Sequence, residues 1–419
     1  MNRLKPKSEF GRNVLTLMTG TTIAQAIPIA VSPILTRIYT PEDFGLFALY
    51  MSIASIGAVI ATGRYDLALM LPKKDEDALW LLTASGIISF GISLFSLIIV
   101  FLFNDQITTL LGNPNISDWL YFIPLSILFS GLYQSLNSWA NRKKAYKTMS
   151  NNRMTQSTIT AGVNVGAGFG HLPISGLIVG GVSGLLVSTL LLARKTYREI
   201  RHYLPLKGWL KMKILMKKYI NFPKYDIAAT LSNVMSYQIT YVLFNSISSG
   251  ATAGHYYLVQ KVLGLPTSIV AASIQQVFKE KAISDFNVFG NAKVLYINIL
   301  KKLLFLAVPP FLFLFFYAQE IFVLFFGQNW AIAGHYAQIL TPMFFLQFIA
   351  SPLSYILYIT KSQRLNLYTQ IIMLLSVLGS FACGYLFNNI DLVIILISLS
   401  MSFIYLFYIL ISYIKSKGT

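Results

Sequence analysis

Residues 72–103 read PKKDEDALWLLTASGIISFGISLFSLIIVFLF, a short charged cluster followed by a run without a charged side chain. The apolar run from 79 to 103 is longer than the roughly 20 residues that an α-helix needs to cross a bilayer. The 419-residue chain is 55% hydrophobic and 11% charged, whereas a soluble domain has roughly 25% charged residues. The composition therefore excludes an ordinary soluble domain and predicts a polytopic membrane protein.

Further apolar runs predict an all-α protein with twelve transmembrane helices, six on each side of a basic middle segment. The predicted spans are 13–38, 44–71, 79–103, 117–139, 152–170, 173–193, 225–247, 252–278, 303–326, 336–359, 367–387 and 391–413. The predicted domains are an N-terminal lobe at 1–193, a basic cytoplasmic connection at 194–224 and a C-terminal lobe at 225–419. Within the connection, apolar and basic residues alternate on helical spacing at 208–220, which predicts an interfacial helix attracted to anionic lipid.

Glycines indicate how the predicted helices pack. Gly45 and Gly254 each precede aromatic residues near the start of a half, which indicates a parallel repeat of the kind found in transporter folds. Two small-residue stripes predict close packing of the fifth and sixth spans. They are Gly162-x3-Gly166-x3-Gly170 and Gly176-x3-Gly180-x3-Gly184.

The basic residues predict the orientation of the chain. Of 33 Lys and Arg residues, all but Arg37, Arg64 and Lys261 fall on one predicted side of the membrane. Basic residues mark cytoplasmic loops, so both termini are predicted to be cytoplasmic. This distribution explains the formal charge of +18 without a nucleic-acid partner. A single cysteine, Cys383, four dispersed histidines and no phosphate-loop motif predict no disulfide, no metal, no cofactor and no ATP hydrolysis by that motif.

The three remaining cations are the candidate functional residues. Arg64 and Lys261 lie roughly 10 and 13 Å inside their predicted spans, and Arg37 ends the first span. A charge near the bilayer centre costs about 2.5–3.5 kcal/mol, so each needs a partner or a wet cavity. Two carboxylates, Asp66 and Asp226, are too few to neutralise three cations, and they are candidates for cation pairing or ion coupling. We expect a cavity that binds an anion rich in phosphate, with structural salt bridges as the alternative.

Several of these segments resemble polysaccharide flippases of the Wzx type. The likeness lies in TPEDFGLF at 40–47, GRYDLALMLP at 63–72, GHYYLVQK at 254–261 and IQQVF at 274–278. These flippases belong to the multidrug/oligosaccharidyl-lipid/polysaccharide (MOP) exporter superfamily. The resemblance implies two six-helix lobes that form a V in the bacterial inner membrane. It also implies that undecaprenyl-pyrophosphate-linked oligosaccharides move from the cytoplasmic to the periplasmic leaflet.

By this resemblance, Arg64 and Lys261, together with Arg37, hold the pyrophosphate. Lys261 stands where an Arg is commoner among relatives, which keeps the charge but loses the planar fork of a guanidinium. Polar residues inside the spans are candidate sugar contacts: Gln25, Asn137, Asn164, Asn233, Tyr237 and Gln238. The implied partners are the lipid-linked oligosaccharide and membrane lipids, with the polysaccharide polymerase and chain-length machinery as further candidates. No catalytic residue is expected, so the protein is predicted not to be an enzyme.

Two other classes of protein stay open. A multidrug or other small-molecule transporter of the same architecture would favour carboxylates for cationic cargo, whereas cations outnumber acids here. A membrane polysaccharide polymerase would need a large periplasmic loop with basic and acidic groups. The longest predicted outer loops have about a dozen residues and contain no Lys or Arg, which favours transport.

Overall fold

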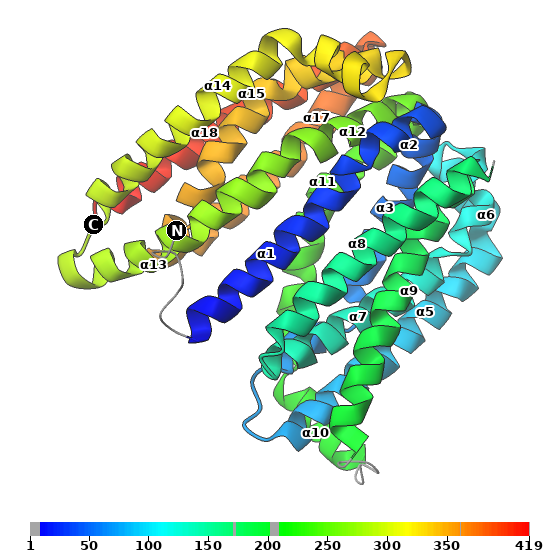
Figure 1. Ribbon diagram of the computed structural model, residues 1–419, viewed down its shortest axis with the longest axis vertical. Coiled ribbons are helices and arrows are strands. Elements are labelled where there is room, and N and C mark those ends of the chain that lie inside the picture. Colours follow the sequence, from blue (N-terminus) through cyan, green and yellow to red (C-terminus); the bar gives the residue numbers. More distant parts are fainter. Residues whose placement is uncertain (1–8, 171–172, 202–208, 361, 419) are drawn as a thin grey trace. The chain divides into compact units, whose positions relative to one another are not determined.

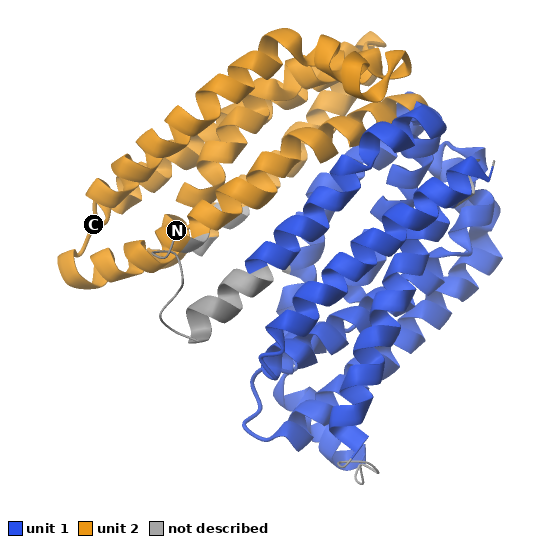
Figure 2. Ribbon diagram, in the orientation of Figure 1, with its two compact units in different colours: residues 1–250 blue, residues 251–419 orange. Residues whose placement is uncertain are grey.

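The computed structural model describes residues 9–170, 173–201, 209–360 and 362–418. These residues form helices joined by short loops, and they contain no β-strand (Figure 1). The chain divides into two compact units, residues 1–250 and 251–419 (Figure 2). The prediction of an all-α fold is confirmed.

Unit 1 holds the helices of the first three-fifths of the chain. They are α1 (Glu9–Ala30), α2 (Ser32–Ile38), α3 (Pro41–Ile60), α4 (Tyr65–Ala68), α5 (Asp75–Leu111), η1 (Pro114–Ile116), α6 (Ser117–Leu120), α7 (Ile123–Arg142), α8 (Tyr146–Phe169), α9 (Pro173–Ile200), α10 (Trp209–Lys218), η3 (Phe222–Asp226) and α11 (Ile227–Ile247). Helix α8 packs between α1 and α9, and α7 packs on α5 and α9, as Figure 1 shows. Buried apolar side chains of α3, α5, α7 and α9 form its main core.

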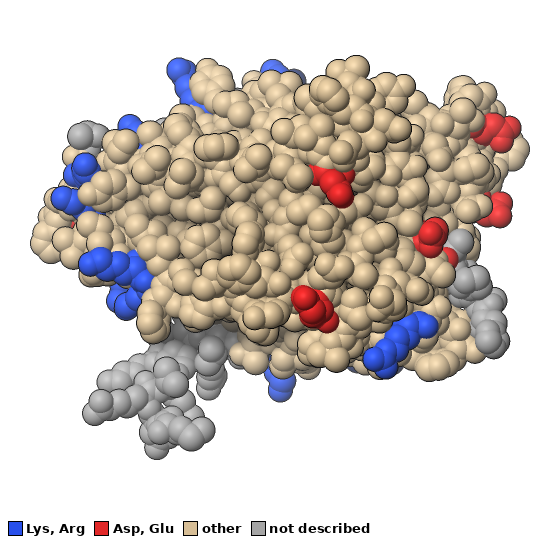
Figure 3. All heavy atoms as spheres, turned by 90° about the horizontal axis from the view of Figure 1, so that it is seen from above, with Lys and Arg blue, Asp and Glu red and all other residues tan. Residues whose placement is uncertain are grey.

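Unit 2 begins within α12 (Gly250–Pro266), which continues through the π-helical turn η4 (Thr267–Ala271) into α13 (Ala272–Phe289). The remaining elements are α14 (Lys293–Phe326), η5 (Gln328–Trp330), α15 (Ala331–Leu353), α16 (Ile356–Ile359), α17 (Gln363–Phe387) and α18 (Ile390–Ser416). Helix α15 packs against both α14 and α18. Much of the outer surface is apolar: Phe305 on α14 is 85% exposed. Figure 3 shows a surface that is largely uncharged, with scattered acidic and basic side chains. Lipid is the solvent that suits such a surface.

Nine helices among the described residues are long and apolar enough to cross a membrane, and the bent pair of Pro114–Leu120 and Ile123–Arg142 makes ten. The chain is therefore a multi-pass membrane protein. The predicted spans 152–170 and 225–247 form α8 and α11, which are helical but do not meet this standard because both carry many polar side chains. Twelve spans and the orientation of the termini stay predictions.

The predicted span 44–71 is not one continuous helix. Helix α3 ends at Ile60, and a turn leads into the four-residue α4. Gly63 (φ 57°) and Arg64 (φ 60°) both adopt the left-handed backbone conformation. Two consecutive residues in this region cannot continue a right-handed helix. This break is what places Arg64 in its observed surroundings.

Only one of the two predicted glycine stripes lies at the α8–α9 contact. A Cβ atom on Gly180 would lie 1.8 Å from the side-chain amide of Asn164, and one on Gly184 would lie 2.0 Å from Oγ1 of Thr160. By contrast, a Cβ on Gly162 or Gly166 would meet no atom within 4 Å among the described residues. The second stripe is confirmed. The first is wrong, because α8 turns its polar side chains, not its glycines, toward α9.

Helix α11 packs on α3 and belongs to unit 1, whereas the predicted C-terminal lobe, which stays a prediction, begins at 225. Hydrogen bonds reinforce this contact. Ser52 Oγ donates to Gln238 Oε1 over 3.0 Å, and Asn245 Nδ2 donates to the Gly45 carbonyl over 3.4 Å. The first helix of the predicted second half, α11, therefore belongs to unit 1, because its polar side chains form hydrogen bonds with α3.

The interfacial helix predicted in the middle connection is present as α10. Met212 and Leu215 are buried against Tyr65, Trp80 and other apolar residues of α4 and α5. Trp209 and Leu210 remain 63% and 71% exposed. Figure 1 shows α10 at one end of unit 1. One set of apolar side chains therefore anchors α10 to unit 1, and a second set remains exposed on its surface.

Candidate functional site

Arg64 lies in the turn between α3 and α4, in a backbone conformation that is unusual for a residue with a side chain. Its φ and ψ are 60° and 12°. Such a conformation costs on the order of 1 kcal/mol and persists where neighbouring contacts impose it. One of these contacts is the hydrogen bond from the Arg64 amide to Thr62 Oγ1, 3.1 Å long. The left-handed conformation that fixes the position of this arginine therefore lowers the stability of the folded chain.

The Arg64 side chain forms an ion pair within unit 1. Its Nε lies 2.5 Å from Oδ2 of Asp226, the last residue of the π-helical turn η3 that leads into α11. The Arg64 and Asp226 side chains are 16% and 38% exposed. Thr230 Oγ1, one turn along α11, lies 3.5 Å from the same carboxylate oxygen. Of the roles predicted for Asp226, the structure shows the one of cation partner.

Asp66 is buried beside this pair but does not join it. It is 4% exposed, and its Oδ1 accepts a hydrogen bond of 2.5 Å from Thr62 Oγ1. The described residues contain no ion pair between Asp66 and Arg64. Thr62 thus links both residues, since its hydroxyl accepts from the Arg64 amide and donates to Asp66. The sequence analysis did not single out Thr62, although its place between Ala61 and Gly63-Arg64 put it beside the site.

Lys261 has different surroundings. It lies in the middle of α12, roughly 16 Å along the helix from Gly250 at 1.5 Å per residue. Its exposure is intermediate, and among the described residues it has no acidic partner. The neighbouring Gln260 instead donates to the Tyr256 hydroxyl, 2.6 Å away. Lys261 is therefore a cation inside a long apolar helix that no carboxylate in the described chain neutralises.

Arg37 is exposed at the end of α2, and in the described part of the chain it pairs with neither of the nearby carboxylates Glu42 and Asp43 that the sequence offers as partners. The Asp43 carboxylate has a different hydrogen-bond partner. It accepts from the Thr40 amide over 2.8 Å, while Thr40 Oγ1 accepts from the Asp43 amide. This capping box starts α3 and holds Asp43 at the helix terminus. A pairing of Arg37 with Asp43 or Glu42 is thus not what the structure contains.

The six candidate sugar contacts lie on four helices of unit 1, α1, α7, α8 and α11. Gln25 is exposed on α1, and Tyr237 is exposed on α11, where Asn233 is half-buried. Gln238 is engaged by Ser52. Asn137 is half-buried on α7, and its side-chain oxygen has no hydrogen-bond partner among the described residues.

Asn164 is a packing residue and not an accessible contact. It is 7% exposed between α8 and α9. Its side-chain amide nitrogen faces two main-chain carbonyls. It donates to the carbonyl of Gly176, 3.1 Å away, and to that of Thr160, 3.0 Å away. Its main-chain carbonyl accepts from the Tyr39 hydroxyl. Both ends of the residue therefore hold helices together, and the sugar contact at Asn164 stays a prediction.

Arg153 is a cation that the sequence analysis counted as part of a cytoplasmic loop. The structure places it two turns into α8, half-buried. Its Nη1 donates to Thr21 Oγ1 of α1 over 2.8 Å, and it has no ion pair among the described residues. The neighbouring Asn152 is 5% exposed, and neither atom of its amide makes a hydrogen bond of good geometry to the described residues. The polar run at 151–153, at the start of the predicted span 152–170, was the signal that could have identified this position.

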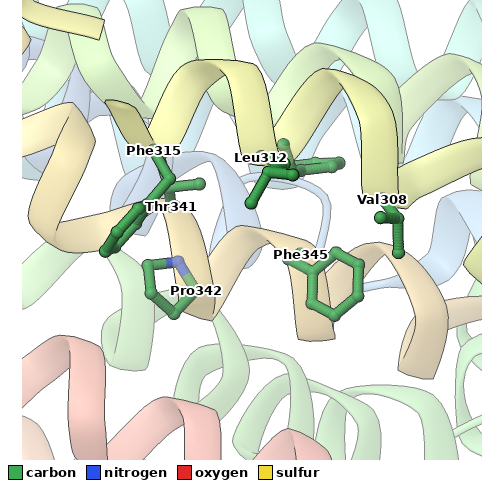
Figure 4. A pocket seen from close by; sticks show the side chains of 7 residues that line it. Val308, Leu312, Phe315, Thr341, Pro342 and Phe345 are labelled. Carbon is green, nitrogen blue, oxygen red and sulfur yellow. The ribbon is translucent and has the colours of Figure 1, made fainter. Parts of the chain in front are cut away.

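Unit 2 also contains an apolar pocket of about 190 Å³ between α14 and α15 (Figure 4). Val308, Leu312 and Phe315 of α14 face Pro342 and Phe345 of α15. The hydroxyl of Thr341, which also lines the pocket, is satisfied by the Ala337 carbonyl at 2.6 Å. With no free polar group in its walls, this pocket suits hydrocarbon and cannot recognise a phosphate or a sugar.

Comparisons with known proteins identify the fold. Among solved structures, the chain is similar to the lipid II flippase MurJ in an inward closed conformation, with a TM-score of 0.74 and 16% identity over 95% of this chain and 87% of that one. It is similar to a MOP superfamily transporter from Pyrococcus furiosus, with a TM-score of 0.62 and 12% identity over 96% and 95% of the two chains. It is also similar to an outward-facing multidrug transporter of the MATE family, with a TM-score of 0.60 and 11% identity over 96% of this chain and 95% of that one. The fold is that of the MOP superfamily.

The sequence itself identifies the family. No curated protein matches the chain. The model of a family described as polysaccharide biosynthesis protein matches residues 34–334, a stretch that includes Arg64, Asp226 and Lys261. That stretch is well over half of the chain. The protein is therefore a multi-pass membrane protein that belongs to the polysaccharide biosynthesis protein family.

Proposed function

We propose that this protein is a flippase for lipid-linked oligosaccharides and not an enzyme. It moves undecaprenyl-pyrophosphate-linked repeat units of a surface polysaccharide, such as O-antigen or capsule, from the cytoplasmic to the periplasmic leaflet of the bacterial inner membrane. Membership of the polysaccharide biosynthesis family and a fold shared with a lipid II flippase support this proposal. The polymerase and chain-length machinery that would use the product are proposed partners.

The observation that carries the proposal is Lys261. A lysine in the middle of an apolar helix, without an acidic partner in the described chain, is costly in a membrane and marks a site for an anion or a wet surface. Lys binds phosphate as a compact point charge, so it tolerates the changing geometry of a moving headgroup. We propose that Lys261 contacts the pyrophosphate of the cargo.

Arg64 has a second proposed role, as a cation that exchanges partners. Asp226 engages its Nε, whereas a guanidinium has five N–H donors and binds phosphate through two of them at once. The cargo phosphate would compete with Asp226 for Arg64, and release of Asp226 would free the start of α11. Arg37 and the exposed polar residues Gln25 and Tyr237 stay candidate contacts.

The function is tested by deleting the gene and identifying the sugar that accumulates. We expect a diphosphate-linked oligosaccharide to accumulate on the cytoplasmic leaflet and surface polysaccharide to disappear. Re-expression of the chain should clear the accumulated oligosaccharide and restore the surface polysaccharide. Lys261→Arg should restore more polysaccharide than Lys261→Gln when both variants reach the same level in the membrane. Normal polysaccharide in the deletion strain, or accumulation of a drug-like cation and no lipid-linked sugar, would refute the proposal.

We also propose twelve spans with both termini in the cytoplasm, which counts the polar helices α8 and α11 as spans. The single cysteine makes this testable, since Cys383 on α17 is exposed and can be replaced by Ser. New cysteines at Glu42 and at Lys74 should then react from opposite sides of the membrane. Labelling of both from the same side would overturn the topology.

A further inference from the structure

A basic hollow lies at the C-terminal end of α9, and neither Arg64 nor Asp226 is among the residues that line it. It has a volume of about 600 Å³ and is lined by Leu191, Arg194, Lys195, Arg198 and Glu199. These five residues recur at intervals of three and four, so they share one face of the helix. Arg194 and Arg198 are four residues apart, which places their Cβ atoms about 6 Å from each other. Two guanidinium groups at this spacing can bracket a single phosphate.

The described acids near this hollow have partners of their own, although Glu199, which lines it, keeps its negative charge. Glu199 accepts a hydrogen bond from the Trp139 indole nitrogen, 3.2 Å away. At the neighbouring end of α7, Asp75 pairs with Arg142 and Lys143. Arg194 and Arg198 are exposed and have no ion pair among the described residues.

Lys195, the third cation of the hollow, is held by the Thr148 hydroxyl of α8. This contact links α9 to α8 beside the hollow. An anion bound by Arg194 and Arg198 would come from outside the described chain.

One helical turn before the cations, the same face of α9 is apolar. Leu190 and Leu191 are 56% and 45% exposed. Both lie in a helix long and apolar enough to cross the bilayer, and the cations come at the end of that helix. An apolar rim beside a pair of guanidiniums matches a molecule with hydrocarbon chains and an anionic head. Basic pockets at the cytoplasmic ends of membrane helices suit such headgroups.

We propose that this hollow is a binding site for the headgroup of an anionic phospholipid. Arg194 and Arg198 hold the phosphate, Lys195 closes one side, and Leu190 and Leu191 contact the first carbons of the chains. The bound lipid would tie the inner end of α9 to that of α8, the two helices that Lys195 and Thr148 already connect. This site is separate from the one proposed for the cargo and does not depend on that function.

The test uses the full-length protein, delipidated in detergent, with lipid binding measured by native mass spectrometry and by thermal unfolding. We expect phosphatidylglycerol, but not phosphatidylcholine, to bind and to raise the midpoint of unfolding. Arg194→Gln/Arg198→Gln should weaken phosphatidylglycerol binding roughly thirtyfold, since each cation near a membrane surface contributes about one factor of five. Arg194→Lys/Arg198→Lys keeps the charge and should recover part of the binding, which also guards against a folding defect.

The matched control is Lys213→Gln/Lys217→Gln, which removes two exposed cations from α10, outside the hollow. This variant should bind phosphatidylglycerol like the parent. Equal losses in both double variants would mean that only net charge matters and would overturn the site. Two other ligands separate the sources of phosphate. Inorganic phosphate that stabilises as well as the phospholipid, or undecaprenyl pyrophosphate that displaces phosphatidylglycerol, would overturn the assignment to a membrane phospholipid.

Discussion

Arg64 in unit 1 and Lys261 in unit 2 are both cations within apolar sequence, but they are treated differently by the fold. A left-handed turn places Arg64 beside Asp226; the Thr62 hydroxyl accepts from the Arg64 amide, and the Thr230 hydroxyl contacts the Asp226 carboxylate. Lys261 lies in an uninterrupted helix and meets no acid in the described chain. The difference separates two ways to tolerate a charge in a membrane: one cation is neutralised by the protein, and the other is left for something else to neutralise.

The largest expected effect follows from removing the unneutralised cation. Lys261→Gln should lower transport at least tenfold, because a charged contact to phosphate is worth about 1.5–3 kcal/mol. It should leave thermal stability unchanged, since no described carboxylate loses its partner. Surface polysaccharide, normalised to the amount of protein in the membrane, is the measurement.

The matched control for Lys261 is Lys279→Gln in the same unit. Lys279 is exposed on α13 and lies over the Tyr355 ring, so its loss removes the same charge from a surface position. Transport should survive this change. A Lys261→Gln variant that transports normally, or that unfolds at a lower temperature while Lys261→Arg does not, would make Lys261 a structural residue like Arg64.

The converse change, at the neutralised cation, should lower stability first. Asp226→Asn leaves Arg64 partly buried without its counter-charge, which we expect to cost about 2–3 kcal/mol; the partial exposure of both groups keeps the cost below that of a fully buried pair. Arg64→Gln should cost less, because Asp226 is the more exposed partner. The free energy of unfolding in detergent measures both changes.

A double-variant cycle shows whether the two residues act as a pair. Arg64→Gln combined with Asp226→Asn should be more stable than the sum of the single changes predicts. Asp105→Asn, which removes an exposed carboxylate of α5, provides the control with no expected effect. Simple additivity in the cycle would show that the contact contributes nothing and that Arg64 is as free as Lys261.

Polar packing inside unit 1 gives the next prediction. Gly180→Ala forces a Cβ against the Asn164 amide and should lower the free energy of unfolding by about 1–2 kcal/mol, because added atoms displace a buried polar group. Gly166→Ala on α8 meets open space and should be neutral or slightly stabilising through its better helix propensity. Equal effects of the two changes would contradict the observed rotation of α8.

The sequence predicts the helices of both units well but predicts the pairing of the cations poorly. Hydrophobic runs locate the helices because burial in lipid requires long uncharged segments whatever the contacts between them. The partner of Arg64 is 162 positions away, and the contact depends on the left-handed turn at Gly63 and Arg64. Periodicity indicated one continuous span there, and no local signal predicts two consecutive residues with positive φ.

The glycine stripes and Arg153 show the same limit. Two stripes with identical spacing have opposite outcomes, because the rotation of α8 is set by which side chains fit against α9. Arg153 looks like a loop cation in a count of basic residues, but it lies in a helix where Thr21 of α1 accepts its hydrogen bond. Spacing within one helix specifies a face; the neighbouring helix decides what that face meets.

The smallest expected effect is at the surface of unit 1, where α10 is tied to α5. Lys211 lies 2.8 Å from Asp77 and 3.6 Å from Glu76. The close contact with Asp77, with the nearby charge of Glu76, raises the pKa of the Lys211 ammonium above its usual value. A raised pKa means that the pair stabilises the docked helix at neutral pH and that this contribution is lost as the pH rises through the folded-state pKa, above about 10.4. The contribution of so exposed a pair is below about 1 kcal/mol.

This loss can be followed with a fluorophore on Leu210→Cys, an exposed position of α10, in a Cys383→Ser background. Anisotropy of the label should fall in alkaline solution in the parent. Lys211→Gln should show the lower anisotropy already at neutral pH and no further alkaline change. Lys213→Gln, which removes an exposed lysine of the same helix, should behave like the parent. If Lys211→Gln leaves the anisotropy unchanged, burial of Met212 and Leu215 holds α10 without help from charge, and pairing in unit 1 matters only where, as at Arg64, the cation is withdrawn from water.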